Sequence, residues 1–214
     1  MPTGPTLLTF VAASLALILV PGPNLLYIVT LSASHGRKIG LASAFGVETG
    51  TLIHVAAAAL GLSALLASSA LALDAVKYAG AAYLIYLGIR TLRSKDAPES
   101  VEQRPEGRSV AKSYLQGVLV NTLNPKVALF FLAFLPQFVD PDRGAVASQI
   151  LVFGSVFFAI ALSCDILYAV TASSLGGWLR GRSSVARRQR YIVGGVYLAL
   201  AAATLATSPD RGGE

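Results

Sequence analysis

Three charged residues lie well inside long apolar runs of this sequence: Glu48, Lys126 and Asp165. An ionised side chain at the centre of a membrane span costs on the order of 3 kcal/mol by insertion scales, so such residues usually face a partner or a wet pathway. A buried carboxylate can bind a proton or an ammonium group, and a lysine can bind a carboxylate. We therefore predict that Asp165 is a proton-coupling or ammonium-binding group, and that Lys126 pairs with it or meets a substrate carboxylate.

Glu48 has two interpretations. It lies within Gly46-Val-Glu-Thr-Gly50, a spacing of small residues that lets two helices approach closely. One interpretation is a gate or substrate-selecting residue near the cytoplasmic vestibule, and the other is a packing face whose carboxylate reaches the cytoplasmic rim. For Asp165 and Lys126, a purely structural ion pair is the alternative. His54 could relay protons, but a hydrogen-bonded packing histidine is the favoured interpretation.

Two apolar runs are broken by residues that disrupt a helix. The first contains Pro21-Gly22-Pro23-Asn24 and the other contains Asn124-Pro125 directly before Lys126. Proline removes a backbone donor, and lipid supplies no water for the freed carbonyls, so paired breaks of this kind point to a transporter binding site. A restarted helix presents free N–H groups that suit a carboxylate. The predicted substrate-binding residues are Gly22, Pro23, Asn24, Asn121, Asn124, Pro125 and Lys126, although the asparagines could instead bond helix to helix.

Other chemistry finds little support in the sequence. A single cysteine, Cys164, excludes a disulfide within the chain and a multi-thiolate metal site built from one copy. No nucleophile, zinc-hydrolase or phosphate-loop motif occurs, so we expect no catalytic residue, no metal site and no cofactor. A divalent-cation transporter would need several hard oxygen ligands, but Lys126 opposes a cation.

The amino-acid composition indicates the class of protein in which these residues lie. Of 214 residues, 54% are hydrophobic and 13% are charged, whereas a soluble domain has about 25% charged residues. With roughly 20 apolar residues to a span, the chain is predicted to be an all-α membrane protein of about six transmembrane helices. The runs are Leu7 to Ser34, Leu41 to Ala67, Ala75 to Leu92, Tyr114 to Val139, Val146 to Leu175, and Ile192 to Thr207. Five spans plus a re-entrant or surface segment is the alternative, since the last run is short.

The positions of the basic residues predict an orientation. Thirteen Lys and Arg residues fall in the loops after spans 1, 3 and 5, and three fall on the opposite side. Cytoplasmic loops are enriched in these residues, so both termini are predicted to face outward. Topology thus accounts for the net charge of +6, and no nucleic-acid partner is expected.

The chain divides at a hydrophilic linker into two groups of three spans. Half 1 covers about 1–93, the cytoplasmic linker about 94–112 and half 2 about 113–214. An odd number of spans in each half makes the halves inverted repeats, with the broken spans 1 and 4 at matching places. Gly80-Ala-Ala-Tyr83-Leu84 recurs as Gly194-Gly-Val-Tyr197-Leu198, although such a match can arise by chance. One polytopic domain is expected, and its glycine-rich faces would allow a homodimer.

The chain resembles the LysE/RhtB-type amino-acid exporters over nearly its whole length. The resemblance rests on the order and spacing of several pieces: Pro-Gly-Pro-Asn at 21–24, Gly46-x-x-x-Gly50, Leu60-Gly61-Leu62, Lys77-x-x-Gly80-x-x-Tyr83-Leu84-x-Tyr86-Leu87-Gly88, Asn121-x-x-Asn124-Pro125-Lys126, and Asp165. It implies a cytoplasmic-membrane exporter of an amino acid or close derivative, driven by protons in antiport. The alternative is a transporter of divalent cations or another small metabolite.

Overall fold

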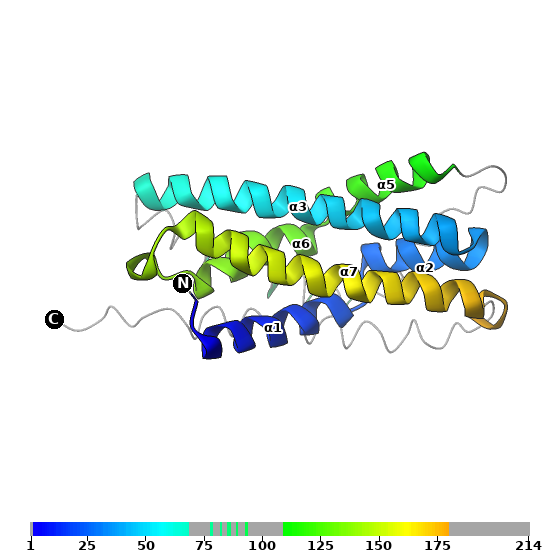
Figure 1. The fold of residues 1–214 in the computed structure, drawn as a ribbon, viewed down its shortest axis with the longest axis horizontal. Coiled ribbons are helices and arrows are strands. Elements are labelled where there is room, and N and C mark those ends of the chain that lie inside the picture. Colours follow the sequence, from blue (N-terminus) through cyan, green and yellow to red (C-terminus); the bar gives the residue numbers. More distant parts are fainter. Residues whose placement is uncertain are drawn as a thin grey trace.

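The computed structural model describes residues 2–68 and 109–179, together with six isolated helical positions between 78 and 93. Every regular element in the described part is helical, which confirms the predicted all-helical class (Figure 1). The elements are α1 (Gly4–Leu19), α2 (Pro23–His35), α3 (Arg37–Ser68), α5 (Val110–Thr122), α6 (Pro125–Leu129), the π-helix η1 (Phe130–Phe134), the 3-10 helices η2 (Leu135–Phe138) and η3 (Pro141–Arg143), and α7 (Val146–Leu179).

Two of these helices are long and apolar enough to cross a membrane alone, over Arg37–Gly61 and Val146–Ser174. Two further spans are each made of a bent pair, which gives up to four spans in the described part of the chain. These four match the predicted runs 1, 2, 4 and 5. The third run falls where only isolated positions are described, and the sixth run and the Gly194 repeat lie outside the described residues.

Each bent pair breaks where the sequence predicts it. The axis turns by 54° between α1 and α2, and by 47° between α5 and the segment Pro125–Phe138. At the first break Val20 and Gly22 are extended, and Pro23 starts α2 at a position where its missing N–H is not needed. At the second break the Asn124 side chain caps the new helix by accepting from the Lys126 N–H, again with Pro125 at the first turn.

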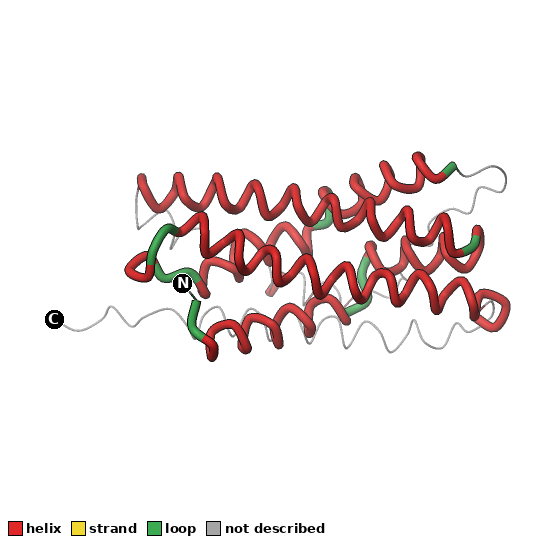
Figure 2. Tube along the Cα trace, viewed as in Figure 1, coloured by secondary structure: helices red, strands yellow, loops and turns green. Residues whose placement is uncertain are grey.

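The long helices α3 and α7 run the full length of the bundle, and both breaks lie near its middle (Figure 2). The end of α2, the start of α5 and the end of α7 lie at one end of the bundle, and the start of α1 lies at the other (Figure 1). Each broken pair therefore consists of one half-helix toward each end. At the second break Asn121, Asn124 and Lys126 are buried, whereas Leu123 and Pro125 are exposed in the described part of the structure.

Helices α3 and α5 pack at glycine. A Cβ added to Gly46 would collide with the Tyr114 carbonyl oxygen, and one added to Gly117 would lie 2.7 Å from the Ser43 carbonyl oxygen. Because neither position has room for a methyl group, the two backbones touch directly. The Gly46-x-x-x-Gly50 spacing thus serves close helix packing.

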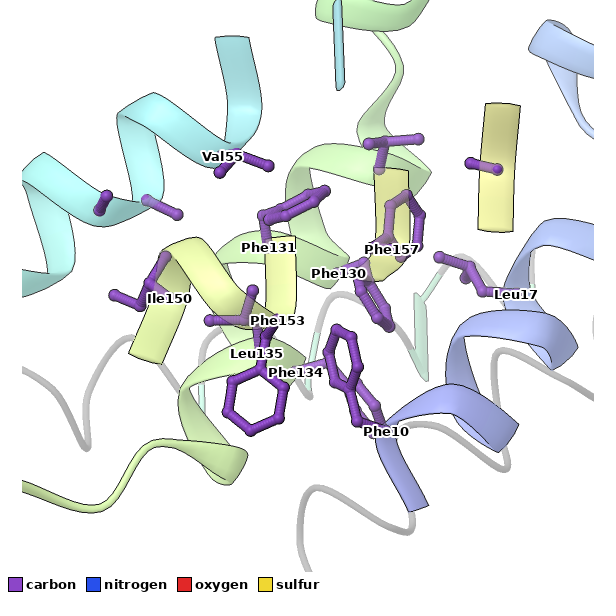
Figure 3. Close-up of a cluster of buried hydrophobic side chains, with 14 of the residues drawn as sticks. Phe10, Leu17, Val55, Phe130, Phe131, Phe134, Leu135, Ile150, Phe153 and Phe157 are labelled. Atoms are coloured by element: carbon purple, nitrogen blue, oxygen red, sulfur yellow. The ribbon is translucent and has the colours of Figure 1, made fainter. Parts of the chain in front are cut away.

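Two apolar clusters fill the bundle on either side of the breaks. The smaller one contains Tyr27, Ile28, Leu31, Ala44, Val47 and Ala169. The larger one is rich in phenylalanine and is supplied by α1, α3, α6 to η2, and α7 (Figure 3). Phe130 contacts the rings of Phe10, Phe134 and Phe157, with centroids 4.9 to 5.8 Å apart. Such tilted and offset pairs each stabilise packing by about 0.5–1.5 kcal/mol beyond area burial.

The glycine contact between α3 and α5 generates a stability prediction. We expect Gly46→Ala to destabilise the protein by about 1–3 kcal/mol, because the methyl group forces two helices apart. Thermal unfolding of the purified protein in detergent measures the change. Gly61→Ala is the matched control, since a Cβ there meets nothing within 4 Å. Equal melting temperatures for the two variants would contradict the packing described here.

Candidate substrate site at the two helix breaks

A cavity lies between the two breaks. Its empty space, including the open side, is about 430 Å³. All three intramembrane ionisable residues predicted from the sequence line it, and so do Gly22 and Asn24. The remaining lining residues are Leu17, Ile18, Val20, Leu25, Thr51, Val127, Phe157 and Ala161.

The predicted asparagines form a chain of amide hydrogen bonds between the broken helices. Asn124 Nδ2 donates to Asn24 Oδ1 at 2.8 Å, and Asn24 Nδ2 donates to Asn121 Oδ1 at 2.7 Å. The chain ends on α3, where Asn121 Nδ2 donates to the Val47 carbonyl at 2.6 Å and to Thr51 Oγ1 at 2.8 Å. These bonds tie the α1–α2 break, the α5–α6 break and α3 together.

The asparagines therefore differ in their access to a ligand. Asn121 is 0% exposed and Asn124 is 3% exposed, and neither lines the cavity. The Asn121 amide bonds to Asn24 and to α3, and the Asn124 amide bonds to Asn24 and to the Lys126 N–H, as in the helix-to-helix interpretation of the sequence. Asn24 does line the cavity, and one of its two amide hydrogens remains for a ligand.

The α2 N-terminus also faces the cavity. No side chain caps this end, because the N-cap residue is Gly22. The Leu26 N–H makes the first intrahelical bond, to the Gly22 carbonyl. The amides of Asn24 and Leu25 precede it, and both residues line the cavity. Free N–H groups at a helix N-terminus suit an anion such as a carboxylate.

Lys126 lies at the first turn of α6 but bonds across to α1. Its Nζ donates to the Val20 carbonyl oxygen at 2.7 Å, beyond the last turn of α1. A cation at this place stabilises the C-terminal end of a helix. A Cβ added to Gly22 would lie 3.5 Å from Lys126 Nζ, so the ammonium also stands beside the N-terminus of α2. Lys126 and Asp165, both described, form no ion pair within 4.0 Å, so the predicted direct pairing is absent from this conformation.

The two carboxyl groups come together from different helices. Glu48 on α3 is 3% exposed and Asp165 on α7 is 7% exposed. Asp165, Glu48 and Lys126 line the same cavity. Glu48 thus points into the bundle at the level of the breaks, away from the cytoplasmic rim proposed in one interpretation.

His54 takes the packing role favoured from the sequence. Its Nε2 lies 3.1 Å from the Asn121 carbonyl oxygen, and since a carbonyl only accepts, Nε2 carries the hydrogen. Its ring stacks on Phe131 with a centroid separation of 6.1 Å and an interplanar angle of 7°. His54 thereby holds the irregular backbone after α5 against α3.

Some cavity residues were not predicted. Thr51 lies one turn after Glu48, while Phe157 and Ala161 precede Asp165 at intervals of four. This helical spacing is a usable signal, because residues three or four apart share a face. The Val20 carbonyl has no such signal, because any residue type supplies a backbone oxygen.

Comparisons with known proteins agree with the resemblance. The family model described as LysE type translocator matches residues 15–208. A homoserine/homoserine lactone efflux protein of Salmonella typhimurium is 33% identical over 172 residues, covering 80% of this chain and 82% of that protein. An uncharacterized membrane protein of Pseudomonas aeruginosa is 32% identical, covering 92% of this chain and 95% of that protein. An uncharacterized membrane protein of Vibrio cholerae is 34% identical, covering 86% of this chain and 87% of that protein.

No solved structure matches the chain. The family model covers most of the sequence and includes both helix breaks, Glu48 and Asp165. The chain belongs to the LysE type translocator family.

Proposed function

We propose that this protein exports an amino acid or a close derivative from the cytoplasm in exchange for protons, through the cavity at the two helix breaks. The observation that carries the proposal is that this cavity has groups for both ends of an amino acid. Membership of a translocator family and relatives named for homoserine efflux support the same class of substrate.

The substrate carboxylate binds at the α2 N-terminus. The Asn24 and Leu25 amides, the free Asn24 amide hydrogen and the Lys126 ammonium surround this place. A charged hydrogen bond here replaces hydration that the substrate loses on entering the bundle. Lys126 gives up or shares its bond to Val20 when the carboxylate arrives.

The substrate ammonium binds at the acidic side of the cavity. Asp165 is the coupling group there, since it is buried, lines the cavity and faces Lys126 across it. The α-carbon substituent then lies toward Leu17, Ile18, Phe157 and Ala161, which are apolar. These side chains give a short or medium side chain a surface to pack on.

The full architecture is six spans in two inverted halves, about 1–93 and 113–214, with both termini outside. The matching breaks of α1–α2 and α5–α6 support this arrangement. So does the placement of Arg37, Lys38 and Lys112 at one end of the bundle, as basic residues favour the cytoplasmic side (Figure 1). Transport proceeds by alternating access, with one half rocking against the other.

Uptake into inverted membrane vesicles tests the function. We expect an acidic vesicle interior to drive accumulation of one or a few labelled amino acids, with L-homoserine first in the panel. Asp165→Asn should abolish the dependence on the pH gradient, because an amide cannot carry the exchanged proton. Asp140→Asn, at an exposed ion pair with Arg143, is the control and should transport normally. Absence of uptake of every amino acid by folded protein would exclude the proposed function.

Lys126→Gln tests the carboxylate end. We expect the KM for homoserine to rise by about 10- to 100-fold, corresponding to a lost charged hydrogen bond of about 1.5–3 kcal/mol. Homoserine lactone has no free carboxylate, so its KM should change much less. A parallel rise for both compounds would mean that Lys126 acts only by holding α1, through Val20.

A further inference from the structure

We propose that Glu48 and Asp165 form one proton site, whose two carboxyl groups share a single proton in the empty transporter. The proton occupies this site whichever substrate the protein carries. Its use in transport, where the substrate ammonium takes the place of the shared proton, rests on the proposed function.

The first argument is a buried oxygen that lacks a donor. Glu48 Oε2 is buried and accepts no hydrogen bond from any group in the described part of the chain. Its carboxyl group lines the same cavity as that of Asp165, and both residues are buried. Two ionised carboxylates are acceptors only, so they cannot bond to each other. One proton between them supplies the missing donor and satisfies both groups.

The second argument is charge. Lys126 is the one cation among the described residues that line the cavity, and it can balance one carboxylate. A second ionised carboxylate would be a buried charge without a partner, next to a like charge, which is strongly disfavoured. With one proton on the pair, the remaining negative charge and Lys126 cancel.

The surrounding elements do not alter this balance. The cavity residues from α1 and α2 are not ionisable, and α6 contributes Lys126. On α7, Cys164 and Tyr168 lie within electrostatic range of Asp165, but both are neutral in their ordinary forms near pH 7. On α3, His54 is engaged with the Asn121 carbonyl. The Thr51 hydroxyl next to Glu48 is a neutral hydrogen-bonding group.

The exchange balances in charge and in protons. On the cytoplasmic side the substrate ammonium enters between the carboxyl groups, and the shared proton leaves to the cytoplasm. On the outer side the substrate leaves with its ammonium, and one proton from outside returns to the pair. Each cycle imports one proton and exports one zwitterion, so one positive charge moves inward. Both the pH gradient and the membrane voltage then drive export.

Glu48 is consequently the residue that makes the site hold a proton at all. With glutamine at position 48, the Asp165 carboxylate is already balanced by Lys126, and no proton is required. Such a protein still binds an ammonium group at Asp165. It therefore exchanges substrate across the membrane without coupling to the pH gradient.

Infrared spectroscopy of the purified full-length protein tests the shared proton directly. At neutral pH we expect one carbonyl-stretch band of a protonated, buried carboxylic acid. Both Glu48→Gln and Asp165→Asn should lose it, and Lys126→Met should double its intensity because both acids then become neutral. Glu48→Asp should keep the band, and the exposed Asp140→Asn variant should leave it unchanged. Elution in size-exclusion chromatography confirms that each variant is folded.

The outcomes separate the alternatives. A band that disappears in only one of the two acid variants would assign the proton to a single residue and overturn the shared site. Absence of the band in the wild type, or an unchanged intensity in Lys126→Met, would also overturn it. None of these results depends on transport, so failure of the proposed function is detected separately by the uptake panel.

A transport measurement tests the coupling step. In vesicles, Glu48→Gln should still exchange labelled for unlabelled L-homoserine, with a higher KM because one of the two carboxylates that contact the ammonium is lost, and it should lose the stimulation by an acidic interior. Retained stimulation in this variant would overturn the role of Glu48 in coupling. Loss of exchange as well as stimulation, with Glu48→Asp restoring neither, would show that Glu48 serves folding or binding alone and would equally overturn it.

Discussion

The structure depends on one constraint: hydrocarbon offers no hydrogen bonds to a polypeptide backbone. Two helices are interrupted deep in the bundle, and each interruption frees carbonyl and N–H groups that water cannot reach. The two interruptions lie side by side, and side chains satisfy some of these groups. Lys126 bonds to the Val20 carbonyl, Asn124 accepts from the Lys126 N–H, and His54 bonds to the Asn121 carbonyl. The amides of Asn24, Asn121 and Asn124 bond to one another in a chain across the gap, and the N–H groups at the start of α2 face the cavity. The side chains that bond at the two breaks also keep the broken helices apart, and the cavity lies between them.

The side chains that pack the bundle differ on the two sides of the layer formed by Asn24, Asn121, Asn124 and Lys126. Toward one end, α3 and α5 touch backbone to backbone at Gly46 and Gly117, which leaves no free volume for rearrangement. Toward the other end, phenylalanine rings from four segments fill the space, and a π-helix at Phe130–Phe134 alters the hydrogen-bond register (Figure 3). Such π segments are rare and often occur at functional sites.

Much of this arrangement was predictable from residue type. Proline next to asparagine in an apolar run indicates a break, and an acid in such a run indicates a polar interior, so both breaks and Asp165 could be located in the sequence. The hydrogen-bond partners of the polar residues could not be predicted in this way. Lys126 was expected to pair with Asp165 or to meet a substrate carboxylate; in the structure its ammonium bonds to the Val20 carbonyl, whose position is set by the bend of α1 and not by any side chain. Asn121 was expected to bind a substrate or to bond helix to helix; in the structure its amide bonds to α3 and to Asn24. Whether such a side chain meets a ligand or a neighbouring helix depends on how each helix is rotated about its axis. The pattern of apolar residues does not reveal this rotation when a span is buried on several faces.

The manner in which α1 is attached has a mechanical consequence. Among the described elements, α1 is held by apolar side chains such as Phe10 and Leu17 and by the single bond from Lys126 to Val20. Contacts between apolar groups have no preferred direction, whereas a hydrogen bond depends on the placement of both of its atoms. The bond from Lys126 to Val20 is therefore the directional link between α1 and the other described elements. A molecule that drew the ammonium away from Val20 would leave α1 held by apolar contacts alone.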